Sequence, residues 1–206
     1  MLAALGLLLA FSAPPVSLDV PPVRGAMNWT RDARFGSDPM DCGGAPLCGV
    51  VALETGLGDG NYNHSAPTVH GLWPETNPYG NSKCIHPGDS SNPTKVYSCY
   101  QGDSPSDQLS FEIHEWGKHG SCAGVSDCDD FFGQICSLVA APLEVMTAAR
   151  KKGGKLRAIA DAVTKAGYTV FATDTANSQV QVATCAGADG KWQFADPSQF
   201  GTVCAS

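Results

Sequence analysis

The pattern of apolar and polar positions along the chain predicts a protein that mixes helices and strands. Between residues 127 and 140, apolar side chains recur at the spacing of one helix face, which is typical of a helix packed against a core. The residues of this stripe are Cys128, Phe131, Phe132, Ile135, Cys136 and Val139. Further helices are predicted over 106–119, 142–152 and 155–166.

Short runs of strand-forming residues complete the pattern. Strands are predicted near 49–55, 67–72, 168–172, 179–185 and 191–194. The stretches 56–66 and 80–105 are rich in Gly, Asn, Ser and Pro and are expected to be loops. This order of elements fits an α+β fold, in which an antiparallel β-sheet has helices packed on one side.

The amino-terminal part of the chain has the composition of a targeting segment. Residues 2–11 form an apolar run that is too short to span a bilayer, so we expect a signal peptide over 1–12. No Lys or Arg precedes the run, and a misplaced start methionine is the alternative. Several prolines within 13–40 predict an extended arm. A chain of 206 residues is then expected to form a single domain over 13–206.

Other features agree with passage through the secretory pathway. Asn28 and Asn63 begin sequons for N-glycosylation, and nine cysteines are typical of a disulfide-bonded protein. We therefore expect a protein that is secreted or held in a vacuolar lumen. The sequence contains no second apolar segment, so we expect no attachment to a membrane. The net charge of −7 argues against a tight nucleic-acid binder, because such affinity depends on Lys and Arg at phosphates.

Candidate chemistry is concentrated in two short segments, 69–75 (VHGLWPE) and 111–122 (FEIHEWGKHGSC). On a helix that turns about 100° per residue, the polar side chains of the second segment share an arc of about 140°. They are His114, Glu115, Lys118, His119 and Cys122. Two imidazoles, a carboxylate and an ammonium group on one face suit general acid–base chemistry on a phosphate.

The first segment is predicted to be a strand on which His70 and Leu72 share one face. A lone histidine in a strand is more often structural, and only its pairing with the second segment makes His70 a candidate. A zinc site is the alternative use of these histidines. His114 and His119 are five residues apart, whereas the zinc motif H-E-x-x-H places its histidines four apart on one face. We therefore expect no metal and no other cofactor.

Together the two segments resemble the signature sequences of the ribonuclease T2 family, which includes acid ribonucleases and plant self-incompatibility ribonucleases. The first segment matches H-G-L-W-P fully. The second retains most of the loose pattern F-W-x-H-E-W-x-K-H-G-T-C, but Glu112 stands where the family usually has an aromatic residue, and Ser121 replaces threonine. The strand near 49–54 is a weak counterpart of the aromatic-rich amino-terminal strand of the family.

The resemblance implies an endoribonuclease that cleaves single-stranded RNA without a metal. The ribose 2′-OH would attack the phosphate to give a 2′,3′-cyclic phosphate, which water then opens to a 3′-phosphate. DNA lacks this hydroxyl and would resist cleavage. By the family pattern, His70 and His119 are the acid–base pair, with His119 favoured as the base. His114 would bind phosphate, Lys118 would stabilise developing charge, and Glu115 would orient its neighbours. A monomer is expected.

The resemblance also implies residues that bind the base. Trp73 would offer a stacking face, Glu75 would accept a hydrogen bond from the base, and Tyr79 is a candidate for its opposite face. One disulfide, Cys84 to Cys122, follows from the family pattern. It would tie the loop after His70 to the helix that carries His119.

A second disulfide is expected between Cys185 and Cys204. The sequence does not assign partners to the remaining cysteines, and one of them is left over. They are Cys42, Cys48, Cys99, Cys128 and Cys136. Two further function classes stay open besides the ribonuclease. One is a catalytically inactive secreted relative that binds RNA or serves as a storage protein, and the other is a zinc hydrolase.

Overall fold

The computed structural model describes residues 39–205, which form one antiparallel sheet with helices against it. The predicted signal peptide, most of the extended arm and Asn28 lie outside the described residues. The strands of the sheet run in the order β2-β1-β4-β3, and β5 pairs with β4. Their bounds are β1 Leu47–Glu54, β2 Thr68–Pro74, β3 Val170–Asp174, β4 Gln179–Ala186 and β5 Trp192–Phe194. The α+β prediction is confirmed.

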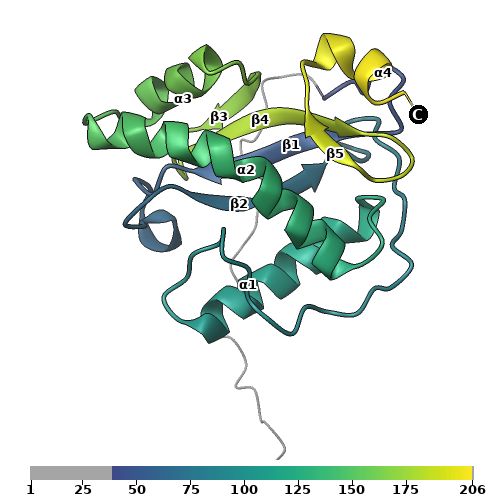
Figure 1. The fold of residues 1–206 in the computed structure, drawn as a ribbon, viewed down its shortest axis with the longest axis horizontal. Helices are drawn as coiled ribbons and strands as arrows, with labels where there is room; N and C mark the ends of the chain where they lie inside the picture. The colour runs from purple at the N-terminus through teal and green to yellow at the C-terminus, as the bar shows by residue number, and fades with distance from the viewer. Residues whose placement is uncertain (1–38, 206) are drawn as a thin grey trace, which may run out of the picture. The chain divides into compact units, whose positions relative to one another are not determined.

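Four α-helices accompany the sheet within the described part of the chain. Figure 1 shows α2 and α3 in front of the sheet and α1 beyond the edge strand β2. The bounds of the helices are α1 Pro105–Lys118, α2 Cys128–Lys151, α3 Leu156–Lys165 and α4 Phe200–Val203. Short 3-10 turns cover Gly60–Tyr62, Gly120–Cys122 and Pro197–Gln199. Neither α4 nor these turns were predicted, because so few residues leave no periodic pattern.

The longest helix corrects one prediction. The sequence predicted separate helices over 127–140 and 142–152, but α2 continues through Pro142. Proline removes one backbone hydrogen bond and crowds the preceding turn, which favours a break. Here Val139 and Met146, on either side of the proline, are both fully buried in the core. Burial of both halves against the same sheet holds the two segments in one helix.

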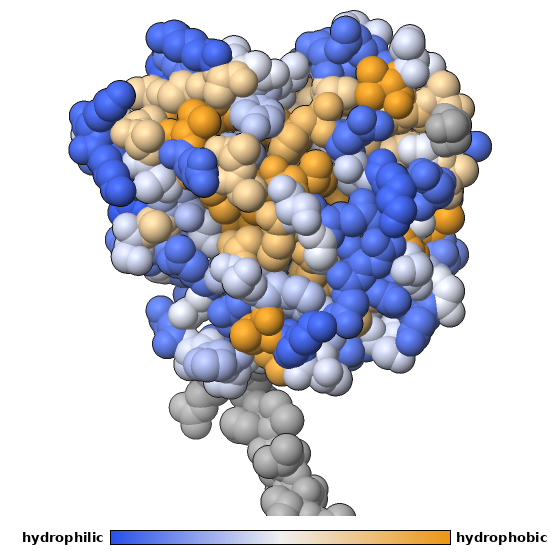
Figure 2. Space-filling model, viewed as in Figure 1, coloured by the Kyte–Doolittle hydropathy of each residue, from blue (hydrophilic) through white to orange (hydrophobic). Residues whose placement is uncertain are grey.

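By length and composition alone, α2 is apolar enough to cross a membrane. Its buried residues instead belong to the protein core, with Phe131, Phe132 and Ile135 fully covered. Figure 2 shows the outer side of α2 and α3, which faces the viewer, and hydrophilic side chains border the apolar ones there. The helix therefore has the amphipathic character of one that lies on a sheet.

The sheet separates two groups of buried apolar side chains. On the face that α2 covers, β1 contributes Val51 and Leu53, which pack with Val180 and Val182 of β4. The alternate residues of the same strands form the second group, which contains Val50, Ala52, Ala183 and Cys185. Because side chains alternate along a strand, Glu54 and Gln179 continue the second face. This is the face on which the candidate site lies.

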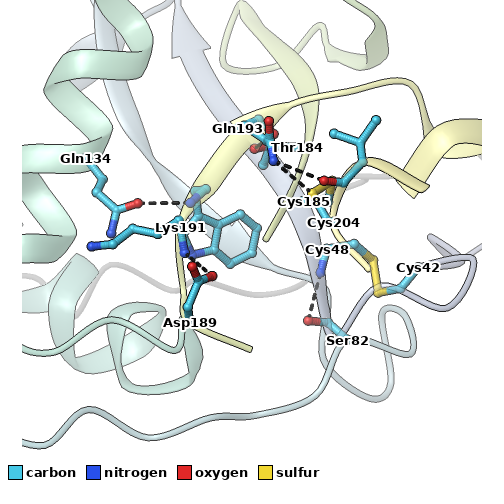
Figure 3. Close-up of a disulfide and its surroundings, with 12 residues drawn as sticks. Cys42, Cys48, Ser82, Gln134, Thr184, Cys185, Asp189, Lys191, Gln193 and Cys204 are labelled. Carbon is cyan, nitrogen blue, oxygen red and sulfur yellow. Dashed lines mark hydrogen bonds between the residues drawn. A yellow bond between two sulfur atoms is a disulfide. The ribbon is translucent and has the colours of Figure 1, made fainter. Parts of the chain in front are cut away.

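Four disulfides stabilise the described chain. They join Cys42 to Cys48, Cys84 to Cys122, Cys99 to Cys136, and Cys185 to Cys204. The second and fourth pairs are those that the sequence analysis expected, and Cys128 is the cysteine left over. Figure 3 shows two of these bridges near β1 and β4, together with Ser82, whose hydroxyl accepts a hydrogen bond from the backbone N–H of Cys48.

Candidate active site

His70 occupies an irregular position in β2. In the ladder with β1, Ala52 lies opposite Gly71 and Leu53 lies opposite Val69, so His70 is an extra residue in a β-bulge. Bulges commonly redirect a side chain beside a functional site. The predicted sharing of a face by His70 and Leu72 is wrong. Leu72 instead packs with Val69 in the core under α2, whereas His70 contacts residues of the other face.

The buried ring of His70 is held by groups from neighbouring strands. Nδ1 lies 2.7 Å from Oε1 of Glu54 and 3.0 Å from the side-chain amide of Gln179. The pKa of Glu54 is lowered: burial acts to raise it, but the hydrogen bonds and charges of His64 and His70 outweigh burial. An ionised carboxylate only accepts hydrogen bonds, so Nδ1 of His70 carries the proton in this contact. The oxygen of the Gln179 amide, rather than its nitrogen, then suits Nδ1.

Nε2 of His70 faces the second predicted segment. It lies 3.6 Å from Oε1 of Glu115, which is an ion-pair distance when the imidazole is protonated. The other carboxylate oxygen, Oε2, accepts a 3.0 Å hydrogen bond from the indole N–H of Trp73. Glu115 is only 1% exposed, and a carboxylate this deeply buried needs such polar partners in place of water. It joins α1 to β2 at the centre of the site.

A glycine makes this approach of α1 to β2 feasible. A Cβ atom on Gly71 would lie 2.0 Å from Oε2 of Glu115 and 3.0 Å from Nε1 of Trp73. The first distance is shorter than any ordinary contact, so a larger residue would displace the carboxylate. The glycine of the first segment therefore has a steric role in the site.

His119 lies just beyond the end of α1. The helix ends at Lys118, and His119 is its C-cap, with φ −120° and ψ −44°. The expected shared helical arc is therefore wrong for His119 and for Cys122, which lies in a 3-10 turn. Departure from helical geometry turns the His119 ring onto Trp73, with centroids 5.5 Å apart. His70 meets the same indole edge-on at 5.1 Å, so Trp73 lies in contact with both imidazoles.

The two other basic residues of α1 differ in exposure. Lys118 is exposed, whereas His114 is partly buried. Burial lowers the pKa of His114, and the positive charges of Lys118 and His70 lower it further. The ring of His70 also meets Phe111 of α1 edge-on at 5.0 Å, which fixes the approach of the helix to the strand. The structure thus brings His114, Lys118 and His70 into one electrostatic environment.

The residues expected to bind a base differ in their surroundings. Trp73 is 5% exposed and Glu75 is 2% exposed, while Tyr79 is 52% exposed. The backbone N–H of Glu75 donates to the carbonyl of Cys48, and the backbone N–H of Tyr79 donates to that of Thr76. Of these three residues, Tyr79 therefore has the most exposed side chain, and its ring is open to solvent.

Glu112, the unusual residue of the second segment, has a structural setting. It is fully buried, and its Oε1 accepts hydrogen bonds from the backbone N–H of Tyr97 and from Gln108. Burial raises its pKa, although both hydrogen bonds act to lower it. The carboxyl of Glu112 thereby connects α1 to the loop before it.

One group of side chains has the spacing of metal ligands. Among residues 39–205, potential ligand atoms of Cys84, His86 and Cys122 lie within 4.8 Å of one another. Both sulfur atoms belong to the Cys84–Cys122 disulfide, and Nδ1 of His86 lies 2.8 Å from the carbonyl oxygen of Ser121. Thiolates rather than disulfide sulfurs bind zinc, so this group does not fit a metal in its oxidised form.

Sequence reasoning missed Glu54, His64 and Gln179. Glu54 carried the clearest signal, because a charged residue ends an otherwise apolar strand, and buried charges need partners. His64 lies in a segment expected to be a loop, and nothing local connects it to the two signature segments. Gln179 reaches His70 only because β4 lies beside β1 in the sheet.

The fold and these contacts define an α+β protein in which two imidazoles, a carboxylate and a lysine lie near one another, a set of groups able to carry out acid–base chemistry. The profile of the Ribonuclease T2 family matches residues 48–155, a range that contains every one of these groups. The chain belongs to the Ribonuclease T2 family. It is also similar in structure to an RNase-related protein from Calystegia sepium, with a TM-score of 0.41 and 16% identity over 76% of this chain and 90% of that one. A search of curated proteins found no match.

Proposed function

We propose that this protein is an endoribonuclease that cleaves single-stranded RNA by metal-independent transphosphorylation. The observation that carries the proposal is the contact of both His70 and His119 with one indole, that of Trp73. Two imidazoles held by a common rigid group can act as a fixed acid–base pair. Family membership supports a ribonuclease.

In the first step, neutral His119 takes the proton of the ribose 2′-OH while the O2′–P bond forms. The P–O5′ bond breaks, and protonated His70 gives its Nε2 proton to the departing O5′. The product is a 2′,3′-cyclic phosphate. In the second step the roles reverse: His70 takes a proton from water, the new hydroxyl attacks phosphorus, and O2′ leaves with the proton from His119.

The remaining residues of α1 stabilise the charge that develops on phosphate. Lys118 supplies a point charge, and His114 donates a hydrogen bond to a phosphate oxygen. Glu115 fixes the indole of Trp73 and stabilises the protonated form of His70 across 3.6 Å. Tyr79, which is 52% exposed, is the proposed stacking platform for a base, and the nearly buried Trp73 and Glu75 are the other proposed base-binding residues.

The cellular setting is part of the same proposal. Four disulfides are typical of proteins from oxidising compartments, and Asn63 is exposed within its sequon. We infer a glycosylated monomer that enters the secretory pathway by means of a signal peptide over 1–12. It would be secreted or retained in a vacuolar lumen.

Product analysis tests the proposal. The purified protein is incubated with a short single-stranded RNA in the presence of a chelator, and the products are identified by mass spectrometry. We expect a 2′,3′-cyclic phosphate that later becomes a 3′-phosphate, and no cleavage of the matching 2′-deoxy oligonucleotide. Binding of RNA without products would favour an inactive relative. Loss of activity with chelator that zinc restores would favour a zinc hydrolase.

Variants of the two histidines provide the second arm. His70→Ala and His119→Ala should each lower turnover by about 10² or more, the usual scale for a positioned acid or base. His86→Ala is the matched control, because His86 is exposed and lies outside the acid–base group. Near-normal activity of either site variant would show that the assigned pair is wrong.

A further inference from the structure

The carboxylate of Glu54 is shared by two histidines. Oε1 lies 2.7 Å from Nδ1 of His70, and Oε2 lies 2.7 Å from Nε2 of His64. The side chain of Glu54 is 5% exposed, and those of His70 and His64 are 5% and 15% exposed. A carboxylate this far from solvent needs compensation for its lost hydration. The two imidazoles supply it, one at each oxygen.

The position of His64 is fixed by the fold. Arg150 of α2 donates hydrogen bonds to the carbonyl oxygens of Thr55, at 3.1 Å, and of His64, at 2.9 Å. The backbone N–H of His64 donates to the carbonyl of Gly56. Gly56 has φ +69°, and a Cβ there would lie 2.4 Å from the guanidinium of Arg150, so only glycine suits this turn. The loop therefore delivers His64 to Glu54 in a defined place.

Resting on the proposed function, we propose that Glu54 is a positioning residue for the catalytic His70. We further propose that His64 and His70 share the negative charge of Glu54, so that protonation of one imidazole weakens proton binding by the other. The three side chains then titrate as one unit. Glu54 keeps the proton of His70 on Nδ1, which leaves Nε2 as the atom that exchanges a proton with the substrate. When His70 protonates O5′, its Nε2–H bond breaks and Glu54 remains ionised.

Other charged and titratable groups face this unit and act on it. Glu115 lies 3.6 Å from Nε2 of His70 and favours its protonated form, whereas His114 opposes that charge. The guanidinium of Arg150 lies against the backbone of His64. Tyr100 is a buried phenol whose pKa is raised by burial and by the charges of Glu115, Glu112 and Glu54, so it stays neutral.

The decisive variant is Glu54→Gln, which keeps an acceptor for Nδ1 but removes the negative charge. The imidazole signals of His70 are followed by NMR against pH in protein labelled at its five histidines. We expect the titration midpoint of His70 to fall by about 1 pH unit, because an opposite charge at this distance favours the imidazolium. One limb of the kcat/KM profile on RNA should move the same way. An unchanged midpoint overturns the positioning role.

His64→Gln tests the shared carboxylate. The amide replaces the imidazole donor without titrating, so the negative charge of Glu54 acts on His70 alone and the midpoint of His70 should rise. No change would overturn the shared titration. Glu144→Gln is the matched control, since Glu144 is exposed on α2, and it should leave His70 unaffected.

The unmodified protein gives a measurement that depends on no variant. Two histidines on one carboxylate should each show a titration curve that extends over the range of the other, rather than a simple one-proton curve. Independent one-proton curves for His64 and His70 overturn the proposal. These titrations need no RNA. A protein that cleaves no RNA would contradict the proposed function, while the NMR result would still decide the role of Glu54.

Discussion

The indole N–H of Trp73 donates a 3.0 Å hydrogen bond to Glu115, and this contact joins the two signature segments across 42 positions of sequence. Both side chains are buried, so water cannot replace either partner. The same carboxylate also faces His70. Glu115 of α1 therefore has two contacts in the site: it holds Trp73, on which His119 stacks, and it places a negative charge beside His70.

Substitutions of Glu115 should separate these two tasks. Glu115→Gln keeps an acceptor for Trp73 but loses the charge, so we expect a folded protein with turnover lowered by about 10² or more. Glu115→Ala leaves the indole N–H without its partner and should also lower the free energy of unfolding by about 1–3 kcal/mol. Urea unfolding and RNA cleavage measure the two effects. Equal stability losses in both variants would contradict this division.

Gly71→Ala should inactivate the protein through crowding. The added Cβ would lie 2.0 Å from Oε2 of Glu115, which must move away from Trp73. We expect activity to fall by about 10² or more, the scale of a lost catalytic orientation. Gly117→Ala is the matched control, because a Cβ there meets nothing within 4 Å, and alanine in a helix stabilises by about 0.5–1 kcal/mol. The idea fails if both alanines leave cleavage rates unchanged.

The two predicted disulfides should differ in their effect on activity. Each should stabilise by ~3 kcal/mol, because each limits the unfolded chain. Serine pairs at Cys84 and Cys122 should lower RNA cleavage more than serine pairs at Cys185 and Cys204. The first bridge ends three residues after His119, whereas the second ties the carboxyl end of the chain to β4. Activity assays at a temperature where both variants are folded make the comparison.

Glu112 should make stability depend on pH. Its folded pKa is raised by burial, so the folded state binds its proton more tightly than the unfolded state does. Its contribution to stability is present below the ordinary pKa of 4.5 and is lost as pH rises through the folded pKa. Glu112→Gln keeps the acceptor for Tyr97 and removes the titration. The fall in Tm from acid to neutral pH should be smaller in this variant; equal slopes would exclude the effect.

Local sequence was informative where chemistry and periodicity coincide. The alternating and helical patterns located β1 to β5 and α1 to α3, and two compact motifs singled out His70 and His119 as candidates. Pro142 locally favours a helix break, but burial of Val139 and Met146 outweighs that preference, so the predicted break is absent. The helix boundary at Lys118 was also missed, although it decides where the His119 ring points.

The residues that contact His70 could not be predicted from the sequence, for a different reason. Glu54 and Gln179 are 16 and 109 positions away from it, and only the pairing of β1 with both β2 and β4 brings them to one place. Strand order depends on contacts distant in sequence, which no local pattern records. Likewise, Arg150 holds the loop that carries His64 by hydrogen bonds to the carbonyl oxygens of Thr55 and His64, which lie far from it in sequence.

Because His70 is the extra residue of a bulge, its proposed chemical role can be tested apart from the strand pairing of β2. Val69 and Leu72 both face the core under α2 although they are three positions apart, because the bulge takes up one of the residues between them. Deleting His70 would give strict alternation, with the same two side chains still inward. We expect the shortened chain to keep its sheet by circular dichroism and to lose cleavage of RNA. The bulge thus places the proposed catalytic histidine in the strand while Val69 and Leu72 keep their places in the core.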